Sequence, residues 1–187
     1  MGRVIEVALH DATAWRAAFA REARLLEHVF GDALVAIHHV GSTSIPELPA
    51  KPIIDILVVL RETVTISRFS GAMEGLGYRV RGECLDAEVL GTPGRFYFSK
   101  EQAGTRTHHT HVCAVGHVEI VEKLAFRDYL RAHPRRAAEY GALKQDLARR
   151  YRRDNIGYMH GKDAFIRTLL KDARQGWSRG VAGSSDV

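Results

Sequence analysis

Residues 53–60, with the sequence Ile-Ile-Asp-Ile-Leu-Val-Val-Leu, constrain the fold of this chain more than any other segment. Every position except Asp55 is apolar, so both sides of the segment must be covered by other parts of the protein. A run this short is typical of a buried strand rather than of a helix. We therefore predict a central strand with a packed layer on each face of its sheet.

The patterns on either side of this strand predict further elements. Alternation at Ile5, Val7 and Leu9 indicates a short edge strand, and Asp11 can cap a helix that ends at Gly31. The other expected segments are a strand at 34–40, a helix at 64–76, strands at 78–83, 95–99 and 109–115, and helices from 119 to 174 that are divided at Pro134 and near 151–155. This order predicts an α/β (α+β) fold, with helices on a mixed or antiparallel sheet and a helical C-terminal half.

The length of 187 residues suits one domain, which we place at residues 1–175, with a small polar tail at 176–187 that we expect to be disordered. No stretch approaches the ~20 apolar residues of a membrane span. The N-terminus has no secretory signal pattern, so we expect a cytoplasmic protein with its two cysteines reduced.

The formal net charge is +5, which fits an anionic ligand and fits equally well an ordinary soluble surface. Arginines gather at 131–136 and at 149–153. Such clusters can form a nucleic-acid stripe or a solvated helix face. Because acidic residues interleave and no binding motif accompanies them, we do not expect nucleic acid to be a partner.

A loop rich in Gly, Ser and Pro precedes the central strand. Gly41 lets the backbone approach a ligand, and the N–H and hydroxyl groups of Ser42, Thr43 and Ser44 can surround phosphate oxygens. Asp55 then places a carboxylate in an apolar strand, which is costly unless the carboxylate is paired or binds a metal. The alternatives are a hydroxyl-rich turn and a salt bridge, for instance from Asp55 to Lys51. Together the two features favour a phosphate site.

The stretch HHVGSTSIPELPAKPIIDILV resembles the signature of the GrpB family, also called UPF0157, within the nucleotidyltransferase superfamily. The resemblance continues through RGECLDAEVLGTPGRFYFSK, THHTHVCAVG, LAFRDYLRAHPRRAAEYGALKQDLA and YMHGKDAFI, and covers about residues 4–170. It implies a nucleotidyltransferase-like sheet with flanking helices. It also implies a divalent metal (Mg, Mn or Zn) and a nucleoside triphosphate, with ATP as our expectation.

This sequence departs from the expected pattern at two positions. Glu47 stands where relatives usually have Gly after the loop proline. Leu57 stands where active nucleotidyltransferases carry the second carboxylate of an Asp-x-Asp pair. Asp55 and Leu57 share a face of the strand, so the geometry is right while the second metal-binding oxygen group is missing.

Histidines on a later strand can supply further ligands. His109 and His111 share a face, and Asp55 with His111 would form a catalytic metal site of nitrogen and oxygen ligands, which favours Zn, Mn, Fe or Ni over Mg. Alternatively, these histidines bind phosphate or substrate directly, or act as a general base. His109 is assigned to the substrate in this interpretation.

The remaining candidates are basic and aromatic side chains. Arg95 and Tyr97 alternate on one strand face and suit phosphate binding and base stacking, or an ordinary amphipathic strand. In the resemblance, lysines of the helical half point toward the cleft; the alternative is a lysine that extends to water. The residues assigned to substrate or phosphate here are Lys51, Lys144, Tyr158 and Lys162.

These observations lead to two main hypotheses. The first is a metal-dependent nucleotidyl- or phosphoryl-transferase that acts on a small-molecule substrate with a nucleoside triphosphate. The second is a non-catalytic module that binds a nucleotide or phosphometabolite, which the missing carboxylate at Leu57 favours. A histidine-based metal hydrolase and an RNA-binding factor are weaker alternatives. The sequence does not predict the acceptor or the oligomeric state.

Overall fold

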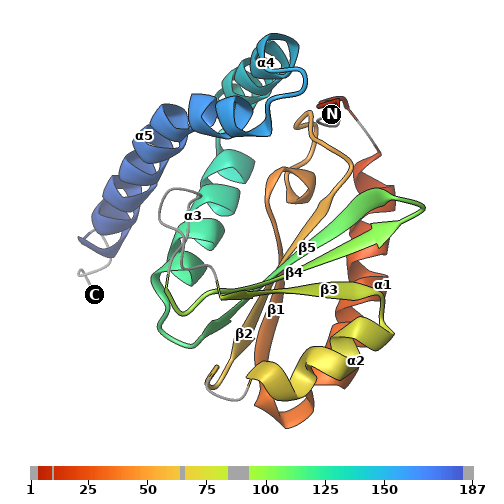
Figure 1. Ribbon diagram of the computed structural model, residues 1–187. Helices are drawn as coiled ribbons and strands as arrows, with labels where there is room; N and C mark the ends of the chain where they lie inside the picture. The colour runs from red at the N-terminus through yellow and green to blue at the C-terminus, as the bar shows by residue number, and fades with distance from the viewer. Residues whose placement is uncertain (1–3, 10, 64–65, 84–92, 183–187) are drawn as a thin grey trace.

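The protein is a mixed five-stranded sheet with helices on both faces, as the sequence predicted (Figure 1). The computed structural model describes residues 4–9, 11–63, 66–83 and 93–182, and side chains as far as residue 174. The strand order is β1-β2-β5-β4-β3. The strands are β1 (Leu34–Val40), β2 (Ile54–Leu60), β3 (Tyr78–Glu83), β4 (Phe96–Gln102) and β5 (Thr105–Ala114).

The pairing of β2 with β5 is parallel, whereas the other neighbouring pairs are antiparallel. In the parallel pair, Asp55 lies opposite His109 and Leu57 lies opposite His111. The apolar run is therefore an interior strand between β1 and β5. This register brings the carboxylate of one strand beside the histidines of another strand that is distant in the sequence.

Helices α1 (Ala12–Phe30) and α2 (Ser70–Gly75) cover one face of the sheet (Figure 1). Asp11 caps α1 by accepting a hydrogen bond from the Thr13 amide at 2.7 Å, and Gly31 follows its last residue, as predicted. Between these helices and the sheet lies the largest apolar core, whose fully buried members include Leu26, Phe30, Ile56, Val58, Leu60, Met73 and Val112.

Helices α3 (Val118–Ala132), α4 (Pro134–Arg150) and α5 (Asn155–Ala182) form the C-terminal half on the other side (Figure 1). Pro134 occupies the first turn of α4, where its missing N–H leaves no helical hydrogen bond unmade, so the predicted division is confirmed. Leu57, Val59 and Cys113 pack toward Ile120 and Leu124 of α3. The same sheet face carries Asp55, since residues 55 and 57 alternate with Ile56.

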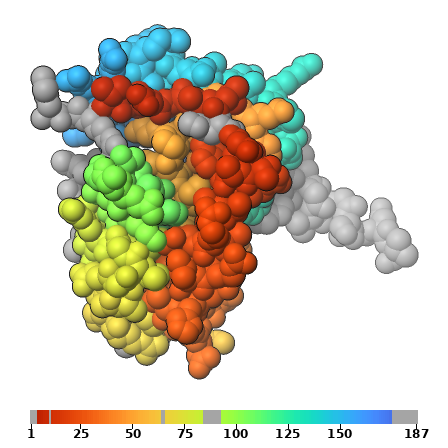
Figure 2. Space-filling view, turned by 90° about the vertical axis from the view of Figure 1, so that its right-hand side faces the viewer, coloured from red at the N-terminus to blue at the C-terminus, as the bar shows by residue number. Residues whose placement is uncertain are grey.

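Two expectations about the N-terminal half were wrong in detail. The edge strand at residues 5–9 is reduced to an isolated bridge between Ala8 and Ala50, because the amide of Ile5 bonds to the carbonyl of Arg152 at 2.8 Å. Figure 2 shows this N-terminal segment lying against α4. The helix expected at 64–76 is α2 preceded by a 3-10 turn at Ile66–Phe69, and residues 64 and 65 lie outside the described residues.

The β4–β5 hairpin is longer than predicted. Ala103 and Gly104 both have positive φ, at 48° and 71°, so they form a tight turn that lets both strands extend to it. The expected tail at 176–187 also differs, because α5 continues to Ala182. Gly176 and Gly180 lower helix propensity without interrupting the backbone hydrogen bonding. In the part of the chain that the structure describes, no helix is long and apolar enough to cross a membrane.

Candidate functional site

Gly41 brings the loop after β1 into contact with Asp55. Its φ is +67°, a conformation that favours glycine, and a Cβ at this position would overlap the Asp55 carboxylate. The loop then forms a short 3-10 turn, Ser42–Ser44. Glu47 also has a positive φ, at 59°, which explains physically why a glycine suits this position.

The three hydroxyl groups of the loop have different roles. Thr43 Oγ1 donates to the Ile53 carbonyl at 3.2 Å, and Ser44 Oγ donates to the Gly41 carbonyl at 2.6 Å. Both side chains are buried. Both residues are candidate phosphate ligands from the sequence, and in this structure their O–H groups donate to backbone carbonyls. The hydroxyl oxygen of Ser42 instead accepts a hydrogen bond from a lysine of α4.

Two arginines of α3 donate to the loop and to the end of β1 that precedes it, and sequence reasoning missed them. Arg131 donates from Nε and Nη2 to the Ser44 carbonyl, at 3.0 and 2.7 Å. Arg127 donates from Nη1 to the His39 carbonyl at 3.2 Å. The only signal in the sequence is their i, i+4 spacing, which places both on one helix face. The sequence favours a solvated helix face for the cluster at 131–136, whereas Arg131 donates to the loop.

Asp55 is hydrogen-bonded to His109. The carboxylate oxygen Oδ1 lies 3.1 Å from His109 Nδ1, as the parallel register requires. Among the described residues, the other ring nitrogen, Nε2, is buried and has no hydrogen-bond partner. An Nδ1–H that donates to Asp55 leaves Nε2 as a buried hydrogen-bond acceptor.

His111 stacks on Tyr97, with ring centroids 5.4 Å apart. Burial lowers the pKa of His111 well below its usual value, and the nearby Lys123 and Arg95 lower it further. The imidazole is therefore neutral at pH 7. Asp55 is hydrogen-bonded to His109, which is a candidate for substrate binding. His111, the candidate metal ligand, is not the histidine that bonds to Asp55.

Three lysines from separate parts of the chain lie near the Gly41–Ser44 loop. We call them the lysine cluster: Lys51, Lys144 and Lys162. Lys144 Nζ donates to Ser42 Oγ at 2.8 Å and to the Pro49 carbonyl. Lys51 and Lys162 lie over the Tyr158 ring, with Nζ 4.3 and 4.5 Å from its centroid. The structure therefore brings together Ser42 and the predicted residues of the helical half.

The lysine cluster is held in a desolvated and positively charged environment. Burial, reinforced by the charge of Lys162, lowers the pKa of Lys144 to about 7 and that of Lys51 to about 8. Burial also lowers the pKa of Lys162. Asp55 opposes all three shifts. Within the described residues, no ion pair joins any of the three ammonium groups to a carboxylate. An anion would supply the missing countercharge.

The remaining basic candidate has a different environment. Arg95 is buried, and its Nη1 lies 3.3 Å from Glu119 of α3, so its charge is already balanced within the fold. Tyr97 lies between the two histidines, edge-on to His109 at a centroid distance of 5.5 Å. The ring therefore orients the histidine pair as well as lining the site.

The donor set fits a two-metal site poorly. Leu57, at the position of the second carboxylate, is 0% exposed and packs with Val40, Val59 and Cys113. Among the residues that the structure describes, no group of three His, Cys, Asp or Glu side chains is arranged to hold a metal ion. Two-metal chemistry relies on several carboxylate oxygens. The described residues therefore do not provide the ligand set of a metal site at Asp55 and His111.

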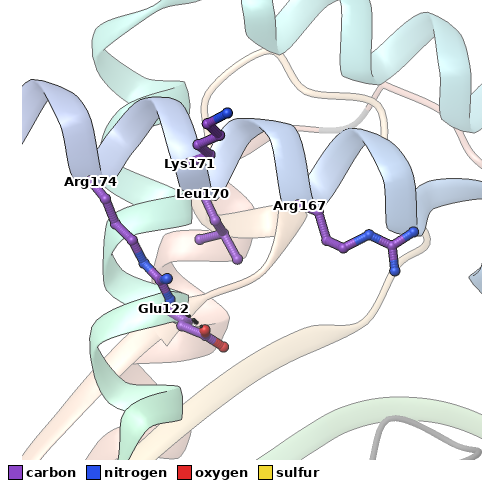
Figure 3. A pocket seen from close by; sticks show the side chains of 5 residues that line it. All are labelled: Glu122, Arg167, Leu170, Lys171 and Arg174. Atoms are coloured by element: carbon purple, nitrogen blue, oxygen red, sulfur yellow. Dashed lines mark hydrogen bonds and ion pairs between the residues drawn. The ribbon is translucent and has the colours of Figure 1, made fainter.

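A separate surface pocket lies between α3 and α5 and is lined by Glu122, Arg167, Leu170, Lys171 and Arg174 (Figure 3). The guanidinium of Arg174 pairs with Glu122 at 2.8 Å, on the side of the pocket where these two helices meet. The pocket shares no residue with the lysine cluster or the Gly41–Ser44 loop. This pocket is therefore separate from the candidate site around Asp55.

Comparison with known families and sequences gives one consistent result. The family model described as GrpB protein matches residues 4–172. The UPF0157 protein YqkA of Bacillus subtilis is 42% identical over 178 residues, which are 95% of this chain and 49% of that protein. A UPF0157 protein of Pseudomonas aeruginosa is 38% identical and is matched over 84% of this chain and 63% of its own length. The chain thus spans about half to two thirds of these relatives.

Solved structures extend the comparison to the fold. The crystal structure of the conserved protein GrpB from Enterococcus faecalis matches with a TM-score of 0.81 and 36% sequence identity. The match covers 91% of this chain and 97% of the Enterococcus faecalis chain. Cid1, an RNA terminal uridylyl transferase, has a TM-score of 0.53 and 15% identity, over 77% of this chain and 42% of its own. At that identity the likeness concerns the fold alone, which is nucleotidyltransferase-like.

Proposed function

This chain belongs to the GrpB family, and from its candidate site we propose that it binds the phosphate groups of a nucleotide or a phosphorylated metabolite. The ligand would lie between the Gly41–Ser44 loop and the lysine cluster. Ser42 and Lys144 would contact one phosphate, while Lys51 and Lys162 would neutralise a second. Lysine is a compact point charge well suited to phosphate oxygens.

The burial of Lys144 is the observation that carries this proposal. The side chain is 2% exposed, and the groups that contact its ammonium are all uncharged: the oxygens of Ser42 and Pro49, and the Tyr140 ring at 4.8 Å from its centroid. A buried charge is strongly unfavourable unless it is paired. Because the described residues provide no carboxylate partner for it, a bound anion is the simplest countercharge.

Calorimetric titration with ATP and with inorganic tripolyphosphate tests the proposal. We expect binding by the wild type and a loss of affinity of about tenfold or more in Lys144→Gln, since a charge-assisted hydrogen bond contributes about 1.5–3 kcal/mol. Lys171→Gln, which changes an exposed lysine of α5, is the matched control and should bind like the wild type. Equal affinities in all three proteins would contradict the proposal.

A second candidate is nucleotidyl transfer to a small-molecule acceptor. The nucleotidyltransferase-like fold favours it, as does the placement of Asp55 against the Gly41 loop and His109. Cid1 is described as a terminal uridylyl transferase, so this fold supports such chemistry in a structural neighbour.

Pyrophosphate release from ATP, measured with Mg²⁺, Mn²⁺ or Zn²⁺ and a panel of small alcohols and amines, tests this second candidate. We expect release that falls by at least a hundredfold in Asp55→Asn, a range typical of removing a group that acts in the transition state. Release that is undiminished in Asp55→Asn would show that another site, or a contaminant, is responsible.

A further inference from the structure

The candidate site combines a deficit of carboxylates with an excess of ammonium groups. Asp55 is one carboxylate where two-metal sites use several, and its Oδ1 is already engaged by His109 at 3.1 Å. Gly41 lies directly against the other oxygen, Oδ2. The position that could add a second carboxylate is filled by the buried Leu57.

The ammonium groups come from three separate elements. Lys51 precedes β2, Lys144 lies on α4 and Lys162 lies on α5. Tyr158 links two of them, because both Lys51 and Lys162 lie over its ring. Neutral oxygens also hold Lys51 and Lys144 in place: Asn155 Oδ1 accepts from Lys51 at 3.0 Å, and Ser42 Oγ accepts from Lys144 at 2.8 Å.

We propose that the lysine cluster takes the place of a divalent cation, so that this protein binds a di- or triphosphate group without metal. The inference rests on the proposed binding of phosphate at this site and specifies how the phosphate charge is neutralised. In metal-dependent nucleotide sites, the cation bridges phosphate oxygens and offsets their charge. Here three fixed ammonium groups do the same from the protein side.

The balance of charge around the cluster supports this assignment. The carboxylates that act on the three lysines are Asp55 and, for Lys162, Asp163. Asp163 is itself 3.3 Å from His160 Nδ1. A divalent cation placed here would face three like charges, whereas a polyphosphate anion would be attracted by all of them.

Binding of Mg²⁺ to the triphosphate should therefore not strengthen the binding of that ligand to the protein. A magnesium complex of a triphosphate carries two fewer negative charges than the free anion, so it gains less from the lysine cluster. We expect the affinity for tripolyphosphate and for ATP to be equal or up to about tenfold higher in EDTA than in millimolar Mg²⁺. An affinity that rises tenfold or more when Mg²⁺ replaces EDTA would overturn the inference.

The variant Asp55→Asn distinguishes the two ways of binding phosphate, because they predict opposite changes in affinity. Asparagine keeps an oxygen that can accept from His109 Nδ1–H while removing a negative charge next to the cluster. If the lysines neutralise the phosphate, binding in EDTA should strengthen severalfold in Asp55→Asn. If a metal held by Asp55 neutralises it, binding in Mg²⁺ should be lost.

The experiment is calorimetric titration of tripolyphosphate and ATP into the wild type, Asp55→Asn and Lys51→Gln/Lys162→Gln, each in EDTA and in Mg²⁺, with thermal unfolding to confirm that each variant is folded. We expect metal-free binding that strengthens in Asp55→Asn and falls at least tenfold in the double variant. Binding only with Mg²⁺, lost in Asp55→Asn, would overturn this inference and leave the proposed function standing. No binding by the wild type in either buffer would overturn both.

Discussion

Two groups of buried polar side chains lie on opposite faces of the sheet, and they differ in how their charges are balanced. On the α1 face is what we call the charge-paired cluster, in which Lys100 Nζ lies 2.8 and 3.1 Å from the two carboxylate oxygens of Glu22. Thr110 Oγ1 donates to Tyr78 Oη at 3.2 Å beside this pair, and His108 Nε2 lies 3.9 Å from Glu22. Each ionised group of this cluster has a partner.

The lysine cluster on the other face has the opposite property. Lys144 is buried as deeply as Glu22, yet its ammonium contacts uncharged groups, namely two neutral oxygens and the Tyr140 ring. A buried lysine with a structural role has its countercharge within the fold, as Lys100 does. The difference indicates that the charge balance of the lysine cluster is completed by a ligand.

The largest expected effect is the loss of stability in Glu22→Gln. Removing one partner of a buried ion pair leaves Lys100 unpaired, which typically costs 3–5 kcal/mol, so we expect the free energy of unfolding to fall by about 3 kcal/mol. Urea denaturation at pH 7 measures it. Affinity for tripolyphosphate should be unchanged among the molecules that remain folded. A loss below about 1 kcal/mol would mean that the two clusters do not differ as described.

Replacing each buried lysine by methionine compares the clusters directly. Lys100→Met strands the Glu22 carboxylate and should destabilise the protein by about 3 kcal/mol. Lys144→Met removes an unpaired cation and should leave the free energy of unfolding within about 1 kcal/mol of the wild type. Equal destabilisation by the two substitutions would show that Lys144 is also paired in the free protein.

The comparison between the wild type and Lys144→Met should depend on pH in a defined direction. The pKa of Lys144 is lowered from 10.5 to about 7 in the folded state, so between these values the unfolded chain binds more protons than the folded one. The contribution of Lys144 to stability therefore rises with pH across this window. The free energy of unfolding of Lys144→Met relative to that of the wild type should be highest at or below pH 7 and should fall as the pH rises toward 10.5, which urea denaturation at several pH values can follow.

Much of this arrangement was accessible from the sequence where the signals are local. The apolar run predicted β2, Asp11 predicted the start of α1 and Pro134 predicted the start of α4, because each depends on neighbouring residues. Gly41 was singled out for close backbone approach, and its contact with Asp55 shows that approach within the fold.

The features that the sequence did not reveal depend on contacts between distant segments. The bond from His109 to Asp55 follows from the parallel register of β2 and β5, which no local pattern specifies. Likewise, the inward hydrogen bonds of Thr43 and Ser44 depend on which carbonyls the folded loop brings near them. The contacts of Arg131 with the loop require the position of α3 relative to β1.

A smaller effect is expected from the arginines that hold the loop. Arg131→Ala removes two hydrogen bonds to the Ser44 carbonyl, so the loop that carries Ser42 should become less ordered and the affinity for tripolyphosphate should fall about tenfold, or ~1.4 kcal/mol. Arg131→Lys should restore part of it. Arg135→Ala, at an exposed position on α4, is the control for loss of positive charge. If Arg135→Ala weakens binding equally, the effect of Arg131 is electrostatic and not positional.

The smallest expected effect is the change of affinity with pH, which tests whether the lysine cluster binds as ammonium groups. The pKa of Lys144 is about 7 and that of Lys51 about 8 in the free protein, and an anion stabilises the protonated forms. In ATP the last phosphate proton leaves near pH ~6, so the charge of this ligand is nearly constant above pH 7. Affinity for ATP should be highest at or below pH 7 and fall about fivefold by pH ~8, because free Lys144 must then take up a proton to bind. In Lys144→Met the remaining decline should shift upward to the pH range set by Lys51. An affinity that is constant or rises across this range would mean that the phosphate is held by groups other than these lysines.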